Sequence, residues 1–161
     1  MDRAEIAVSQ WRREKPELDL LPMKVVGRLS EAAMLMGRNR LEPLFAQYGL
    51  QRGEFDVLAT LRRSGEPYAL TPTQLYDATM VSSGGMTNRL DRLEKAGLIA
   101  RKPNPDDRRG TLVSLTDRGL RLVDEIVPVH LENERDALKS LTVEEQVSLS
   151  DLLGRVIAGL K

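Results

Sequence analysis

Apolar residues along the chain recur mostly at intervals of three and four, the spacing of one helix face. The first such stretch predicts a helix over residues 3–14, which ends before Pro16. A longer stretch predicts a helix over residues 23–48, with a kink at Pro43 because proline lacks the backbone N–H that the helix needs. Residues 51–63 follow as a third helix.

The middle of the chain carries two shorter helical patterns separated by a turn. Thr71 is a suitable N-cap for a helix over residues 72–79, which has proline at its first position. After a turn at residues 80–82, a second helix is predicted over residues 83–96 and ends at Gly97. Its predicted buried face consists of Leu90, Leu93 and Ala96.

The pattern then changes from helical spacing to alternation. Residues 98–102 and 110–115 are predicted as two strands, joined by a charged hairpin loop over residues 103–110. A long helix is expected over residues 117–138 and a final one after the capping box that begins at Thr142. The predicted fold is mainly α with a small β-wing: a winged helix-turn-helix with a helical extension at each end.

The charge of the chain is balanced overall but uneven along its length. The 161 residues include 24 basic and 24 acidic side chains, so the net charge is zero, whereas many nucleic-acid-binding domains are basic. Residues 82–110, however, are net positive by three. A local basic surface on a neutral body is compatible with DNA binding.

Several function classes are excluded by what the sequence lacks. It has no cysteine, which removes thiol catalysis, thiol redox sensing and disulfides, and a single histidine, His130, which makes a structural metal improbable. The sequence contains no nucleophile–base pair and no phosphate-binding glycine loop of the kind that indicates an enzyme. No cofactor is expected. Residues 1–10 do not resemble a secretory signal and no apolar run is long enough for a bilayer, so we expect a cytoplasmic protein without a membrane partner.

The start of the second short helix has the composition of a DNA-reading element. A recognition helix inserts its N-terminal part into the major groove, and small residues there let the backbone approach a phosphate. Side chains such as Thr87, Asn88 and Arg92 can reach base edges or phosphates. The alternative is a capped amphipathic helix with no nucleic-acid partner.

The charged hairpin forms a second candidate contact. Arg108 and Arg109 at its tip suit the narrow, electronegative minor groove, and Asp107 can pair with Arg109 and hold the shape of the loop. The alternative is a solvated turn.

Two runs in this region resemble the MarR family of bacterial regulators. They are the run from Arg89 to Ile99 and the wing run from Asp107 to Gly119, and the resemblance extends over residues 24–160. It implies an obligate homodimer, a palindromic operator in double-stranded DNA, and a small ligand that releases the DNA. By position, it implies that Arg109, with Arg108, enters the minor groove, and that the groove contacts are Ser82, Ser83, Gly84, Thr87, Asn88 and Arg92.

The resemblance also predicts how the chain is divided. Residues 1–22 are an added N-terminal helix and connector, and residues 51–116 are the winged helix-turn-helix. Residues 23–50 and 117–161 form the helical dimerisation region.

The N-terminal run from Gln10 to Asp19 is similar to the added first helix of the urate-responsive subgroup of this family. The chain is similar to members of that subgroup at four characteristic positions, which in this sequence are Trp11, Asp56, Arg89 and Arg101. A purine anion needs a flat aromatic surface and guanidinium groups for its charge. The implied partner is therefore a small aromatic or carboxylate anion, with urate as one candidate.

Other interpretations of these four residues stay open. Trp11 can be a core side chain, Asp56 can form a purely structural ion pair with Arg89 or Arg101, and Arg101 can contact phosphate. The protein can also respond to another phenolic or carboxylate ligand, or be a winged-helix interaction module that does not bind DNA.

Overall fold

The structure, a computed structural model, describes residues 1–51, 53–80 and 85–161, with only the backbone described at positions 108 and 109. The chain divides into two compact units. Unit 1 comprises Met1–Pro43 and Glu134–Lys161, and unit 2 comprises Leu44–Asn133. Among the described residues, no helix has the length and apolar character that crossing a bilayer requires.

Unit 1 is helical. Its N-terminal part contains α1 (Arg3–Glu14), with the predicted bounds, and α2 (Leu21–Met36), which begins two residues earlier than predicted. Its C-terminal part contains the end of α7 (Asp117–Ala137) and α8 (Val143–Gly159), which begins at the predicted capping box of Thr142.

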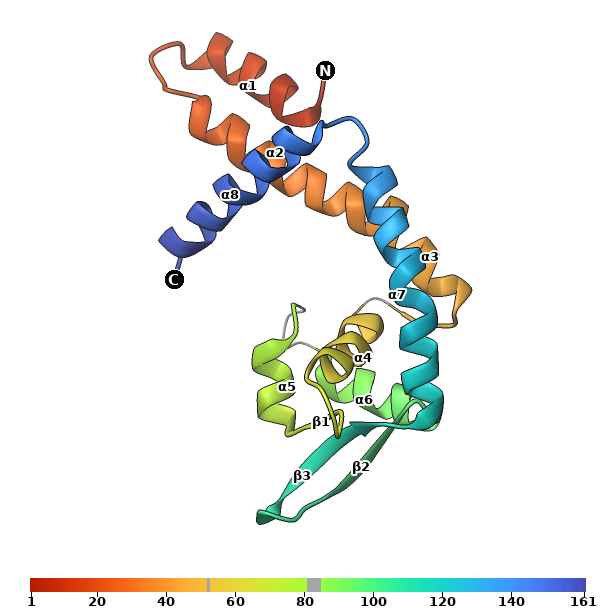
Figure 1. The fold of residues 1–161 in the computed structure, drawn as a ribbon. Coiled ribbons are helices and arrows are strands. Elements are labelled where there is room, and N and C mark those ends of the chain that lie inside the picture. The colour runs from red at the N-terminus through yellow and green to blue at the C-terminus, as the bar shows by residue number, and fades with distance from the viewer. Residues whose placement is uncertain (52, 81–84) are drawn as a thin grey trace. The chain divides into compact units, whose positions relative to one another are not determined.

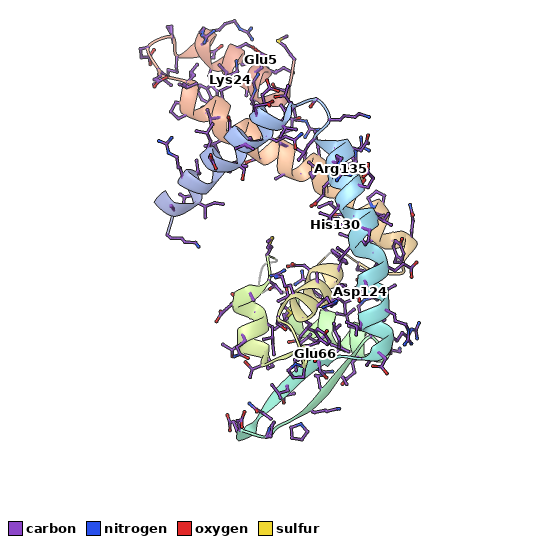
Figure 2. All side chains as sticks on the ribbon, viewed as in Figure 1. Glu5, Lys24, Glu66, Asp124, His130 and Arg135 are labelled. Atoms are coloured by element: carbon purple, nitrogen blue, oxygen red, sulfur yellow. The ribbon has the colours of Figure 1, made fainter. Side chains whose placement is uncertain are left out.

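Charged side chains join α1 to α2. Lys24 Nζ lies 3.3 Å from Glu5 Oε1, and both labelled side chains can be followed in Figure 2. Arg28 Nη2 lies 2.8 Å from Asp2 Oδ2. The two helices cross closely at Gly27, where a Cβ atom would lie 2.9 Å from the Ala4 Cβ.

The predicted long second helix is interrupted by a wider turn. After α2 the chain forms the π-helix η1 (Gly37–Leu41) and then α3 (Glu42–Gln47), and the Glu42 amide donates to the Gly37 carbonyl. The kink predicted at Pro43 is therefore a π-turn that ends just before the proline. Proline has no N–H for the carbonyl four residues earlier, so the helix path must change at this point.

Unit 2 combines three short helices, most of the long helix α7 and a small sheet; the short helices and the sheet run from yellow to teal in Figure 1. The helices are α4 (Glu54–Arg63), α5 (Pro72–Ala78) and α6 (Met86–Lys95). The strands are β1 (Ala69–Leu70), β2 (Ile99–Asn104) and β3 (Asp107–Leu115), antiparallel in the order β1-β3-β2. The largest fully buried apolar side chains are Leu58, Leu61, Leu75, Leu93, Ile99, Ile126, Val57, Val113 and Val123.

Several details differ from the sequence prediction, among them the start of α4, which lies at Glu54 rather than at residue 51. β1 was not predicted, because a two-residue strand has no periodicity of its own. The hairpin strands extend further than predicted, so only Pro105 and Asp106 separate them, after a register shift at Asn104. α6 begins at Met86 rather than at residue 83. Ala96, predicted as buried, is exposed in the single chain.

The end of α6 is joined to the start of α7 through two glycines. Gly97 adopts φ 71° and ends α6, and its carbonyl accepts a 2.7 Å hydrogen bond from the Thr116 hydroxyl. The same hydroxyl oxygen accepts from the Gly119 amide at 3.0 Å. A Cβ atom at Gly119 would lie 2.0 Å from the Leu98 carbonyl oxygen, so the backbones can approach this closely only with glycine there.

Replacement of Gly119 by alanine should therefore separate these backbones. We expect Gly119→Ala to lower the free energy of unfolding by about 1–3 kcal/mol, the usual cost of overpacking, measured by urea denaturation. Gly37→Ala is the control, because its Cβ would meet only the Glu42 carboxylate oxygen at 3.9 Å. Equal stability of the two variants would contradict the role assigned to Gly119.

Candidate nucleic-acid interface

The first helix of the helix-turn-helix, α5, is held by a complete capping box. The Thr71 hydroxyl accepts from the Gln74 amide at 3.2 Å, and the Gln74 side chain accepts from the Thr71 amide at 3.0 Å. Leu75 faces inward and is completely buried. The cap that the sequence predicted at Thr71 is confirmed.

The second helix, α6, separates apolar from polar residues cleanly. Met86, Leu90 and Leu93 recur at helical spacing and are buried. Thr87 and Asn88, in the first turn, are exposed. One face of α6 therefore packs into the interior of the unit. On the opposite face, the first turn of the helix presents polar side chains to the solvent.

A buried carboxylate attaches α6 to α4. Glu54 keeps only 3% of its side-chain area exposed, and its Oε1 lies 2.7 Å from Arg92 Nε. Its other oxygen accepts from the Gln51 amide at 2.6 Å. Arg92 itself is half exposed, so its two terminal amino groups can still meet another anion.

Asp56 contacts the chain that follows α5. Its Oδ2 accepts from the Met80 amide at 2.6 Å, and its Oδ1 lies 3.8 Å from Arg63 Nη1. Arg63 also donates to the Ala78 carbonyl. Asp56 and Arg63 thus join α4 to the chain on the N-terminal side of the turn.

Arg101 links β2 to α6. Its Nη2 lies 2.6 Å from Asp91 Oδ1 and 2.6 Å from Glu94 Oε2, and its backbone amide donates to Glu94 Oε1 at 3.2 Å. We call these three residues the Arg101 cluster. Hydrogen bonds from Arg101 hold the pKa of Glu94 below its ordinary value, and the two carboxylates raise the pKa of Arg101.

Two of the four predicted ligand residues, Asp56 and Arg101, have different ion-pair partners. Asp56 lies near Arg63, and Arg101 is paired with Asp91 and Glu94. The alternative of an Asp56–Arg101 pair is wrong. Two atoms of the Arg89 guanidinium lie within 4.0 Å of the position that a Cβ of Gly85 would occupy, at the start of α6.

The remaining predicted site residues are distributed as follows. Trp11 belongs to α1 of unit 1 and is 45% exposed, so it is not a buried core side chain within its unit. Ser82, Ser83 and Gly84 lie outside the described residues, as do the side chains of Arg108 and Arg109 and hence the predicted Asp107–Arg109 pair.

Sequence reasoning missed four interface residues that form ion pairs in the structure: Glu54, Arg63, Asp91 and Glu94. A signal was present for two of them: Asp91 and Glu94 are three residues apart, a spacing that places them on one helix face. Glu54 follows Gln51 by three residues at a helix start, the spacing of a side chain that reaches back to an orphan amide.

Two consecutive short helices, the second with an exposed polar first turn, followed by a two-stranded antiparallel wing, define a winged helix-turn-helix DNA-binding protein. The sequence model of the MarR family matches residues 48–110. The chain is 48% identical over 149 residues to the HTH-type transcriptional regulator PecS of Dickeya dadantii, covering 92% of this chain and 89% of PecS. The chain belongs to the MarR family of DNA-binding transcriptional regulators, not to an enzyme family.

Solved structures agree with this assignment. Sco3205, a MarR family regulator from Streptomyces coelicolor in complex with DNA, matches with a TM-score of 0.78 at 27% identity, covering 91% of this chain and 92% of that one. BpsR of Bordetella bronchiseptica, whose DNA binding is regulated by 6-hydroxynicotinic acid, matches with a TM-score of 0.69 at 28% identity, covering 83% and 98%.

The Glu54–Arg92 pair predicts two distinguishable mutant phenotypes. Arg92→Ala removes a cation, so it should weaken DNA binding and reduce the slope of log affinity against log salt by about one. Glu54→Gln keeps that cation but loosens its orientation, so it should weaken binding without changing the slope. Fluorescence anisotropy of a labelled duplex at several salt concentrations measures both quantities. An unchanged slope in Arg92→Ala would show that Arg92 only positions the helix.

The Arg101 cluster predicts an acid-sensitive contact between α6 and β2. Since the pKa of folded Glu94 lies below its ordinary value of 4.5, the stabilisation is complete above that value and is lost as the pH falls through the folded pKa. In Arg101→Gln the Glu94 carboxyl should titrate closer to 4.5. Carboxyl NMR shifts followed from pH 6 to about pH 2 give both midpoints. Identical midpoints would refute the coupling.

Proposed function

We propose that this chain is a ligand-released transcriptional regulator, acting as a repressor, that binds a palindromic operator as a homodimer. The observation that carries the proposal is the polar face of α6: Thr87 and Asn88 are exposed while Met86, Leu90 and Leu93 on the same helix are buried. An exposed, polar N-terminal turn is what a recognition helix inserts into the major groove.

The contacts proposed for DNA follow from position on this helix and on the wing. Thr87 and Asn88 read base edges, and the free amino groups of Arg92 meet a phosphate while its Nε stays on Glu54. Further groove contacts are proposed for Ser82, Ser83 and Gly84, and minor-groove contacts for Arg108 and Arg109, with Asp107 paired to Arg109.

A second copy of the chain is the proposed occupant of the apolar faces in unit 1. α8 buries none of its side chains, and exposes Val147, Leu152 and Val156 by 57%, 54% and 46%. α2 likewise buries none and exposes Val25 and Val26 by more than half. Monomeric proteins rarely leave so much continuous apolar surface in water, and two-fold dimers match palindromic half-sites.

The proposed ligand is a small aromatic anion, for which urate is one candidate. Its proposed contacts are Trp11, Asp56, Arg89 and Arg101, on the resemblance to the urate-responsive subgroup. An anion that attracts Arg101 must compete with Asp91 and Glu94, and its binding would weaken the link between β2 and α6. The ligand can then shift the population of dimers away from the DNA-binding arrangement.

A different aromatic acid is the second candidate ligand. The observation that favours it is the regulation of BpsR by 6-hydroxynicotinic acid, a flat anion of similar size. The groups on the protein select for negative charge and flatness more than for one ring system.

The regulator proposal is tested on a labelled DNA fragment from upstream of the chain's own gene, by anisotropy at low salt. The protein should bind it, and Asn88→Ala should weaken binding by about 1–3 kcal/mol, the loss of one base contact. The control is Asn39→Ala, which replaces an exposed asparagine in unit 1 and should not weaken DNA binding. Absence of binding at low salt, where phosphate contacts are strongest, would contradict DNA binding and favour an interaction module.

Ligand release is tested in the same assay. Urate should lower the DNA affinity and change the fluorescence of Trp11, the only tryptophan, and Arg101→Gln should reduce both responses. If 6-hydroxynicotinate produces these responses and urate does not, the urate assignment is wrong. If neither ligand does, the proposed ligand class is wrong.

Dimerisation through α8 is tested by placing a charge on its apolar face. Leu152→Asp should convert the dimer to a monomer in sedimentation equilibrium and abolish tight operator binding, because a buried unpaired carboxylate is strongly unfavourable. Ser150→Asp, an equally acidic change two residues away, is the control. A monomeric wild-type protein would contradict the proposal.

A further inference from the structure

Unit 2 contains a cavity of about 410 Å³ at the joint between the end of α6 and the start of α7. Its lining comes from the residue after α3 (Tyr48), from the end of α6 (Ala96) and from the first turns of α7. The volume lies in the range of about 300–1,000 Å³ typical of small-molecule sites. Trp11, Asp56, Arg89 and Arg101 do not line it, so it is distinct from the ligand site proposed above.

The floor of the cavity is apolar and its rim is cationic. The apolar part consists of Leu98, Leu122 and Tyr48, of which Leu98 is buried. Arg118 and Arg121 are both exposed, and across residues 1–51, 53–80 and 85–161 neither has a hydrogen-bonding or ion-pairing partner for its guanidinium. By contrast, Arg62, Arg92 and Arg101 in the same unit are all paired with carboxylates.

The charges around the cavity indicate the kind of ligand. Two guanidinium groups and the single carboxylate of Glu125 leave one net positive charge. A monocarboxylate would neutralise that charge, and guanidinium groups match the geometry of carboxylates. Its apolar body would cover Leu98 and Leu122, and Glu125 could accept a hydrogen bond from a hydroxyl or amine of the ligand.

The position of the cavity connects it to the recognition helix. Arg118 Nη1 lies 3.9 Å from the place that a Cβ of Gly97 would occupy, directly at the end of α6. Ala96 and Leu98, on either side of Gly97, both line the cavity. A ligand there would contact the joint that Thr116 and Gly119 hold together, and so act on the orientation of α6.

We propose that this cavity is a second effector site, which binds a small monocarboxylate with an apolar body through Arg118 and Arg121. The binding itself is independent of the proposed function, whereas the effect on DNA rests on it. Two sites on one subunit, each in contact with α6 or its wing, would let two chemically different anions act on the same helix.

The test is a titration of DNA-free protein with benzoate, followed by the methyl NMR signals of Leu98 and Leu122. These signals should shift and saturate, and the double variant Arg118→Gln/Arg121→Gln should raise the dissociation constant at least tenfold. The control variant Arg12→Gln/Arg13→Gln removes the same charge from exposed arginines of α1. It should leave the dissociation constant for benzoate within twofold of the wild-type value. Benzyl alcohol, the uncharged analogue, should bind at least tenfold more weakly.

Two results would overturn the site: Leu98 and Leu122 shifts that do not saturate, or saturation that survives in the Arg118→Gln/Arg121→Gln variant. Because no DNA is present, these outcomes do not depend on whether the chain is a regulator. The effector role is measured separately, by operator anisotropy with and without benzoate. Binding in the cavity with an unchanged operator affinity would overturn that role, whereas failure of the protein to bind any operator would concern the proposed function alone.

Discussion

The position of the recognition helix depends on one nearly buried carboxylate. Glu54 bonds both the Gln51 amide at the start of α4 and the Arg92 guanidinium on α6. A charge removed from water is tolerated only when its hydrogen bonds are satisfied, so the start of α4 and the middle of α6 are held at a defined separation. The apolar face of α6, with Leu90 and Leu93, supplies the packing energy. The ion pair between Glu54 and Arg92 fixes the orientation of α6 relative to α4.

The second attachment of α6 is of a different kind. The Arg101 cluster lies at the surface, where ion pairs are worth little individually because solvent screens them. An exposed pair with two competing carboxylates is also easily exchanged for an external anion. The helix is thus held by one nearly buried ion pair, through Arg92, and by one more exposed cluster, through Asp91 and Glu94. Such an arrangement fits the ligand release proposed above, in which α6 changes position while the rest of the fold is kept.

The sequence predicted much of this fold because its signals are local. The bounds of α1, the cap at Thr71 and the capping box at Thr142 depend on side chains within three residues of one another. The partners of Arg101 and Asp56 could not be predicted in the same way. The family resemblance implies both residues, but which carboxylate meets which guanidinium depends on how α4, α6 and β2 pack. β1 was missed for a related reason, since it exists only through pairing with β3.

The most direct test of the account is hydrogen exchange of the backbone amides with and without an operator duplex. DNA should slow exchange in α6 and in the β2–β3 hairpin, while the amides of α1 keep their rates. Addition of urate or another effector anion to the complex should return exchange in α6 toward the DNA-free rates. Protection confined to unit 1, or an absence of protection in α6, would contradict the claim that this helix both reads DNA and receives the ligand signal.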